Sequence, residues 1–457
     1  MVGIGTGGSV WRGQPRCRPD RRRDPGHEAG PGTPPESSAG TSGGGGRVKL
    51  FLFDDRAADA WRPFSLTRPT GEVRFGSLTL RARIERWAKQ PATASFTRSW
   101  LAEFTEPGAP PAVPRDHRLN GGGALLMSSR FVPHDDAPSH DYMESAGPVL
   151  FVCRNQIAGV SIPEGGEIPD GEWMLDPVEP AGTQTVEVPG RMLDSVWQLV
   201  EFGPERLVQY VQRSAGDSAA APELPTGVHR IGSGPVVFGR DVTLEPGVVL
   251  DTRRGGIVLG DRSEVRAGAR IEGPFAADTD CRFLGGSYAC VSAGVRSHLR
   301  GELEATTTFG FVNKAHDGFL GHAVIGRWVN LGALTTNSDL KSTYGSVTMG
   351  GPNGSADTGL LKFGCLLGDH VKTAIGTLLT TGAVVGAGAS VFGDRSPEQW
   401  VAPFAWGASG SAGSYDLERF LITADRVFQR RDAEFNDRVR AWLTGCWQRA
   451  VDEASAA

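Results

Sequence analysis

Hydrophobic residues recur at every sixth position in the second half of the chain. Four series share this spacing: Phe238, Leu244 and Leu250; Leu259, Val265 and Ile271; Phe319, Ile325 and Leu331; and Leu367, Thr373, Leu379, Val385 and Val391. Small residues follow many of these positions, among them Gly239, Gly260, Gly326, Gly332, Gly368 and Gly386. Hexads of this kind predict a parallel β-helix, in which three short strands form one triangular coil. We expect the aliphatic residue of each hexad to point inward and the glycines to turn corners where φ is positive.

The longest series fills an uncharged stretch of 20 residues, from Thr373 to Phe392. Hydropathy alone would favour a membrane-spanning helix for a stretch of this length. It contains four glycines, however, and a transmembrane helix has no reason to repeat at every sixth residue. We therefore assign it to the β-helix and expect no membrane segment.

Asn337 interrupts the hexads, because it is polar where an aliphatic residue is expected after Leu331. The coil could continue, since counting in steps of six from Asn337 leads to Leu361, which is again aliphatic. The run GGPNG at 350–354 would disrupt its strands, however. We expect a loop that leaves the β-helix near Asn337 and returns by Leu361, and loops on a rigid scaffold often carry binding groups.

The first half of the chain has the patterns of an α/β domain. Apolar runs predict strands at 48–53 and 148–152. Helical spacing predicts helices at 78–89 and 193–213, the second with a break near Gly203-Pro204. Strands that alternate with helices are typical of an α/β fold.

These patterns divide the chain into four parts. Residues 1–46 contain 13 glycines and few apolar groups, so we expect a disordered tail. The α/β domain is expected at 47–215 and the β-helix at 228–412, with a polar linker between them. Residues 413–450 have helical spacing and are expected to form one helix that packs on the β-helix.

Composition excludes several classes of protein. The 47 basic and 52 acidic residues give a net charge of −5, so no basic field predicts binding to nucleic acid or an anionic membrane. The six cysteines include no C-x-x-C pair, which is typical of buried thiols in a reducing cytoplasm. The N-terminus has no apolar run of the kind found in signal peptides, so we expect a cytoplasmic protein.

The densest polar cluster in the β-helix region is the run NKAHDGFLGH at 313–322. Together with Ile325-Gly326 and the run NLGA at 330–333, it resembles the acetyltransferase half of the bifunctional N-acetylglucosamine-1-phosphate uridyltransferases. A closer resemblance is to the bacterial uridyltransferase-like family of sugar nucleotidyltransferases. It is carried by these segments: Thr67-Arg68-Pro69, Arg74, Gly76, Arg81, 313–321, Asn337-Ser338, Asp357-Thr358-Gly359, Leu367-Gly368-Asp369-His370 and Pro403-Phe404-Ala405-Trp406-Gly407.

The resemblance implies a left-handed β-helix that forms homotrimers, with acyl-CoA sites between neighbouring copies. His316 matches the catalytic base, and an imidazole suits removal of a proton from an amine or hydroxyl that attacks a thioester. Asn330 matches a sugar-binding asparagine, and Asn337 matches another only if two residues are skipped. Lys314 or Lys362 is a candidate for the phosphate of a sugar or of CoA.

Two departures from the acetyltransferases concern the acceptor substrate. Phe319 stands where those enzymes have tyrosine, and Gly321-His322-Ala323 replaces their Gly-Asp-Ala. Without the surrounding motif, His316 would be interpreted as a surface or stacking residue, as is usual for a single histidine in a β-helix. A metal site is not predicted, because His316 and His322 are six residues apart and should lie on successive faces.

The α/β domain lacks one feature of working nucleotidyltransferases, a glycine-rich turn that holds phosphates after the first strand. Here the strand ends in the run DDRA at 54–57. We therefore predict a degenerate nucleotidyltransferase-like domain, which would require Mg²⁺ only if it is active. Arg68, Arg74 and Arg81 are either bidentate donors to a sugar phosphate or nucleotide, or ordinary packing residues.

The sequence thus predicts a transferase of sugar-nucleotide or cell-envelope precursor metabolism. The first hypothesis is acyl transfer from acyl-CoA, with acetyl-CoA as the expected donor, to a sugar phosphate or nucleotide sugar at His316. The second is nucleotidyl transfer from an NTP to a sugar 1-phosphate. The third is a non-catalytic scaffold that binds sugar nucleotides.

Overall fold

A seven-stranded sheet forms the centre of the first half of the chain, with strand order β10-β8-β9-β6-β1-β4-β5. The computed structural model describes residues 48–119, 122–134, 147–179, 183–216, 222–393, 396–407 and 413–456, so the predicted tail lies outside the described residues. The sheet strands are β1 (Lys49–Phe53), β4 (Ala92–Thr97), β5 (Ala112–Pro114), β6 (Ala124–Ser128), β8 (Val149–Cys153), β9 (Gln156–Ile162) and β10 (Gln184–Glu187). β1 pairs in parallel with β4 and β6, whereas β9 is antiparallel to β6 and β8.

The predicted elements of this domain are confirmed. β1 and β8 are the two expected strands, α2 (Leu80–Ala88) is the first expected helix, and the second is broken into α4 (Gln198–Glu201) and α5 (Gly203–Gly216). The remaining elements are short: α1 (Arg56–Asp59), α3 (Gly171–Leu175), β2 (Arg74–Phe75), β3 (Leu78–Thr79), β7 (Phe131–Pro133), β11 (Gly190–Met192) and the 3₁₀ turns Thr70–Glu72 and Ser99–Leu101.

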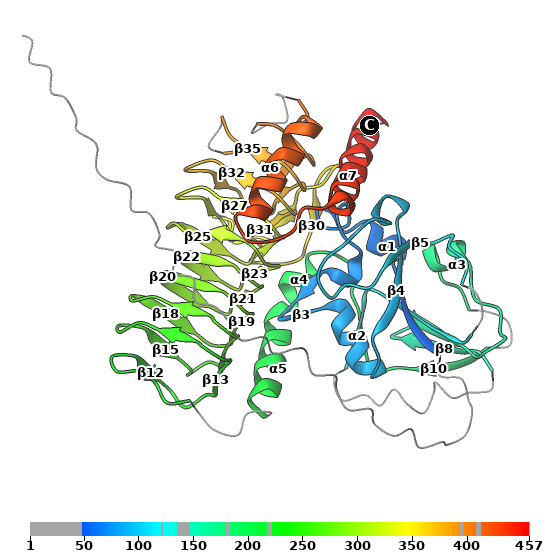
Figure 1. The fold of residues 1–457 in the computed structure, drawn as a ribbon, viewed down its shortest axis with the longest axis horizontal. Coiled ribbons are helices and arrows are strands. Elements are labelled where there is room, and N and C mark those ends of the chain that lie inside the picture. Colours follow the sequence, from blue (N-terminus) through cyan, green and yellow to red (C-terminus); the bar gives the residue numbers. More distant parts are fainter. Residues whose placement is uncertain are drawn as a thin grey trace, which may run out of the picture. The chain divides into compact units, whose positions relative to one another are not determined.

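The second half is the predicted left-handed parallel β-helix, whose strands lie on three faces. Figure 1 shows its coils stacked from β12 to β35. The first face contains β13 (Val236–Phe238), β16 (Ile257–Leu259), β19 (Phe275–Ala277), β21 (Ser292–Ala293), β23 (Thr307–Thr308), β26 (Val324–Ile325), β31 (Cys365–Leu367), β34 (Ala383–Val385) and β36 (Trp400–Val401).

The second and third faces share two strands that continue around a corner, β20 (Arg282–Ala289) and β22 (His298–Glu304). The second face also contains β14 (Thr243–Leu244), β17 (Glu264–Val265), β24 (Asn313–Lys314), β27 (Asn330–Leu331), β32 (Lys372–Thr373) and β35 (Ser390–Val391). The third contains β12 (His229–Ile231), β15 (Val249–Asp251), β18 (Ala269–Glu272), β25 (Phe319–Gly321), β28 (Thr336–Asn337) and β33 (Leu378–Leu379).

The predicted inward positions are largely confirmed, because the hexad residues Leu259, Val265 and Ile271 are fully buried. One position was wrong. Leu320 is buried beside Leu303, whereas Phe319 is only half-buried. The coil that contains them is 17 residues long, since Thr307 pairs with Val324, so the phase of six shifts by one residue.

The predicted role of the corner glycines was also wrong. Gly326 and Gly368 do not have positive φ; the residues two positions later, Trp328 and His370, do, at 63° each. A Cβ on Gly326 would lie 2.7 Å from the backbone nitrogen of Asp369 in the next coil. Glycine is therefore required here by the close approach of neighbouring coils.

The predicted loop leaves the β-helix after β28 and returns at β31, and it contains the antiparallel pair β29 (Thr348–Met349) and β30 (Ala356–Asp357). The prediction of one C-terminal helix was wrong. The segment forms α6 (Leu417–Gln429) and α7 (Asp437–Ala456), separated by a turn (Figure 1).

The two C-terminal helices pack on different parts of the molecule. Phe428 of α6 stacks on Trp328 at a corner of the β-helix, with ring centroids 4.1 Å apart. Trp442 of α7 packs instead against Phe104 and donates a hydrogen bond to the carbonyl of Thr67. The C-terminal segment therefore joins the β-helix to the α/β domain.

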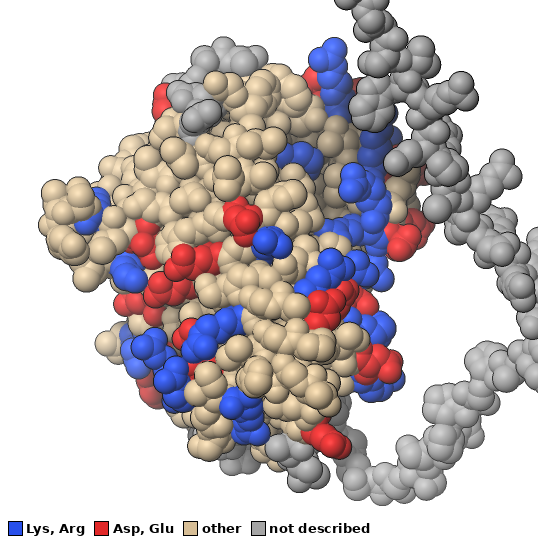
Figure 2. Space-filling model, turned by 90° about the vertical axis from the view of Figure 1, so that its left-hand side faces the viewer, with Lys and Arg blue, Asp and Glu red and all other residues tan. Residues whose placement is uncertain are grey.

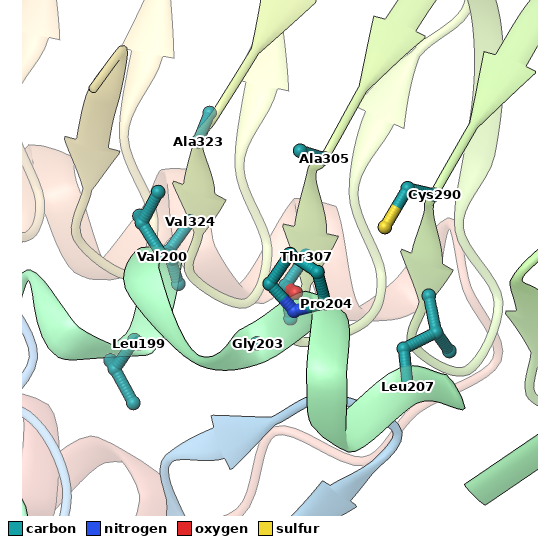
Figure 3. Close-up of a pocket in the computed structure, with 10 residues that line it drawn as sticks. All are labelled: Leu199, Val200, Gly203, Pro204, Leu207, Cys290, Ala305, Thr307, Ala323 and Val324. Atoms are coloured by element: carbon teal, nitrogen blue, oxygen red, sulfur yellow. The ribbon is translucent and has the colours of Figure 1, made fainter. Parts of the chain in front are cut away.

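α4 and α5 cover part of the first face of the β-helix (Figure 3). Val200 lies beside Val324, and Leu207 lies below the strand that follows Cys290. The space left between them is only about 10 Å³, so this contact is close packing between the two domains and has no room for a ligand.

Candidate functional site

The carboxyl end of β1 is the place where the sheet topology favours a ligand. The chain passes from β1 to β4 on one side and returns to β6 on the other. Ligands of open α/β sheets bind at such a switch point, outside the carboxyl ends of the strands. Asp54 and Asp55 follow β1 there.

Ion pairs fill this switch point. Asp55 accepts hydrogen bonds from the backbone nitrogen of Ala58 (2.9 Å) and from Nε of Arg130 (2.8 Å), so its carboxylate caps α1. Asp54 lies 3.0 Å from Arg98 and is equally buried. Carboxylates thus occupy the position at which a phosphate would need free backbone N–H groups.

A hollow of about 930 Å³ lies beside the switch point, at the ends of β4 and β5. Its lining includes Arg115, His117, Arg118 and Asp170. Arg115 also pairs with Asp59 at 2.5 Å, so it is partly neutralised by the domain itself.

The three arginines predicted to bind phosphate form ion pairs within the protein. Arg68 is buried and donates to Asp369 of the β-helix at 2.7 Å and to Glu106 at 3.0 Å. Burial by itself would lower the pKa of Arg68, but the carboxylates of Asp369 and Glu106 raise it above its usual value.

Arg74 and Arg81 are in the same situation. Arg74 is buried and donates to Asp278 of the β-helix at 2.6 Å. Arg81 donates to Glu72 at 2.5 Å and to Glu85 at 2.7 Å. The positions of all three arginines therefore fit the packing alternative and do not support contact with a substrate.

His316 lies on the outside of the β-helix, at the corner between the second and third faces, and its side chain is exposed. The next residue, Asp317, pairs with Arg300 at 3.0 Å. Gly318 follows with φ of 133°, and a Cβ there would collide with the carbonyl oxygen of Thr335. The local sequence therefore holds a tight corner that presents the imidazole to solvent.

Two predicted substrate-binding residues point inward. Lys314 is fully buried, and its ammonium group donates to the carbonyl oxygens of His316 and Asp317 in the corner. Burial lowers the pKa of Lys314 to about 8. Asn337 is also buried and exchanges two hydrogen bonds with the backbone of Gly321, at 2.9 and 3.0 Å. Both predictions are corrected: these side chains close the coil and do not face a substrate.

The other two predicted binding residues are accessible. Asn330 is exposed on β27, and its Oδ1 accepts a hydrogen bond from Nδ2 of Asn313 at 2.9 Å. Both asparagines line a hollow of about 440 Å³ beside the end of α6. Lys362 is half-exposed in the inserted loop and lies 3.4 Å from Glu304.

Residues 50–215 match the family model of sugar nucleotidyl transferases. This segment is therefore similar to the sugar nucleotidyl transferases. No curated protein gives a significant match to the chain. The match supports a transferase of sugar-nucleotide metabolism, and it ends before the β-helix begins. In the described part of the chain, no helix combines the length and apolarity needed to cross a bilayer.

A further pair of polar residues lies at the base of the inserted loop, far along the chain from the nucleotidyltransferase-like domain. Nδ1 of His322 is 2.7 Å from the carboxylate of Asp339, and both side chains are largely buried. Sequence reasoning considered His322 but missed Asp339. The signal was their separation of 17 residues, because residues one coil apart lie on adjacent strands of a β-helix.

His370, in the motif that follows the loop, packs in the interior and has a structural role. It is buried among Trp328, Phe420 and Phe428, and its ring lies parallel to that of Phe428. Burial holds the pKa of His370 well below its usual value, so the ring is neutral. It contributes to the docking of α6 on the β-helix.

Proposed function

We propose that the protein transfers an acyl group from acyl-CoA, with acetyl-CoA as the expected donor, to a sugar phosphate or nucleotide sugar at the β-helix. The observation that carries this proposal is the exposed imidazole of His316 on the outer wall, three residues beyond Asn313 in the 440 Å³ hollow. Three residues of extended chain span at most roughly 10 Å, so base and hollow are within reach of one small substrate.

In this reaction His316 removes a proton from the amine or hydroxyl of the acceptor. The acceptor atom attacks the thioester carbonyl, a new amide or ester bond forms, and the carbon–sulfur bond breaks. The thiolate of CoA leaves and takes the proton from the imidazolium. Asn330 holds the acceptor, and Lys362 is the accessible lysine for a phosphate of CoA.

A homotrimer would complete the site by placing the second face of one copy against a neighbouring copy. The exposed position of His316 at a corner is compatible with this arrangement. The trimer belongs to the proposal, and sedimentation or scattering of the full chain tests it.

The test of the proposed function is the His316→Ala variant, assayed for release of CoA from acetyl-CoA with panels of amino sugars, sugar phosphates and nucleotide sugars. Loss of a general base should lower the rate by about 10²–10⁴-fold. The matched control is His229→Ala, which removes another exposed histidine, on β12. Thermal unfolding of both variants should stay unchanged. Full activity of His316→Ala, or equal loss in both variants, would contradict the proposal.

Nucleotidyl transfer is a second candidate, supported by the family match over residues 50–215 and by the 930 Å³ hollow. The chain would then use Mg²⁺ and release pyrophosphate from an NTP and a sugar 1-phosphate. Arg118, which is exposed in that hollow, is the residue to change. Release of pyrophosphate that is lost in Arg118→Gln would favour this candidate. Binding of nucleotide sugars without any turnover would favour a non-catalytic scaffold.

A further inference from the structure

The 440 Å³ hollow on the second face is lined by groups from two distant parts of the chain. β32 contributes Lys372, and the end of α6 contributes Arg430 and Arg431. β24 and β27 contribute the amides of Asn313 and Asn330. None of the residues that line this hollow is a carboxylate.

The absence of a carboxylate here contrasts with the first coils of the β-helix. There Arg240 pairs with Asp261 at 2.6 Å, and Arg262 pairs with Asp280 at 2.7 Å. On the face of the molecule that Figure 2 presents, basic and acidic side chains also lie next to one another. A helix C-terminus favours arginine, which accounts in part for Arg430, but it does not account for a lysine that reaches the same hollow from the β-helix.

The electrostatics of the hollow favour an anion. Burial lowers the pKa of Lys372 to about 8. Burial also lowers the pKa of Arg431, and the nearby guanidinium groups of Arg282, Arg430 and Arg296 lower it further. His298 is neutral, because burial and then Arg431 lower its pKa to about 4. An anion in the hollow would relieve the repulsion among these cations.

We propose that this hollow binds the phosphate group of a small molecule that also carries hydroxyl groups. Arg430 and Lys372 would hold the phosphate by charge-assisted hydrogen bonds. The bond from Asn313 to Oδ1 of Asn330 leaves the Nδ2 group of Asn330 free to donate to a ligand hydroxyl. The volume of about 440 Å³ lies within the range of small-molecule sites. The inference deepens the proposed function and rests on it only for the identity of the ligand.

Isothermal titration of the full chain tests the site with four probes: inorganic phosphate, glucose 1-phosphate, glucose and CoA. We expect saturable binding of glucose 1-phosphate and none of glucose. Arg430→Gln and Lys372→Gln should each weaken binding about tenfold, as expected for one charge-assisted hydrogen bond. Tighter binding of CoA than of glucose 1-phosphate would identify CoA as the source of the phosphate.

Arg426→Gln is the matched control, because it removes an exposed arginine one turn earlier in α6 that does not line the hollow. Its affinity and the thermal unfolding of all three variants should match those of the wild type. Absence of phosphate binding, or equal weakening by Arg426→Gln, overturns the inference. Failure of the proposed function is distinguishable, because His316→Ala would then keep its activity while phosphate still binds.

Discussion

The α/β domain and the β-helix each have a candidate ligand site with cationic side chains. The two sites differ in whether carboxylates of the protein neutralise these cations. At the carboxyl end of β1, Arg98 and Arg130 are paired with Asp54 and Asp55. At the second face of the β-helix, the lining of the hollow contains cations and amides without a carboxylate. Carboxylates of the protein therefore neutralise the cations of the first site, whereas no carboxylate lines the second.

The same difference occurs within the shared motifs. The segment that contains Arg68 and the segment that contains Asp369 both carry the family resemblance, and they bind each other although they are 301 residues apart. Thr67 adds a further hydrogen bond to Asp369, at 2.7 Å. Arg68 therefore serves the contact between the two domains.

The sharpest test of this comparison is Arg68→Met, which removes the guanidinium group that Asp369 and Glu106 share and leaves Asp369 without a charged side-chain partner. We expect the free energy of unfolding to fall by about 3–5 kcal/mol, as for other broken buried ion pairs. Urea denaturation measures the change. Arg240→Gln breaks an exposed pair and should leave the midpoint unchanged. A similar midpoint for both variants would show that Arg68 is not structural.

A second test compares two asparagines, Asn337 and Asn330. Asn337→Leu restores the aliphatic residue that the hexads predict, yet it leaves the N–H and C=O groups of Gly321 without partners. We expect a loss of about 1–3 kcal/mol in the free energy of unfolding for such unsatisfied buried groups. Asn330→Leu should retain stability and weaken binding of glucose 1-phosphate. Stabilisation by Asn337→Leu would contradict the assigned role of this amide.

A third test uses pH and the buried His370. Because burial lowers its pKa in the folded state, the unfolded chain binds a proton below about pH 6.5 that the folded chain does not. The contribution of His370 to stability should therefore fall by up to about 1.4 kcal/mol per pH unit below that point and stay level above it.

His370→Phe should reduce this slope, measured by denaturation at pH 7.5, 6.5 and 5.5. Phenylalanine fits this corner, since Phe311 and Phe404 adopt similar positive φ angles of 55° and 54° in other coils. Identical slopes in the variant and the wild type would show that His370 does not bind a proton on unfolding.

The sequence alone predicted the β-helix, its inward residues and the inserted loop, because these depend on a period that neighbouring residues carry. It failed at Phe319, because one shortened coil shifts the phase by a residue. It also failed at Lys314, because a polar residue in a motif is expected to contact substrate. Only the fold shows that its ammonium group turns inward to the carbonyls of its own corner.

The amino-acid sequence by itself determined the two folds and the exposed corner that presents His316. Tertiary structure decided which cations are neutralised, since Arg68 meets Asp369 only when the domains pack. It also brought Arg430 to the same hollow as Asn330, although these residues lie on separate elements. Periodicity is a local property of the chain, whereas charge pairing depends on distances in space that no local pattern records.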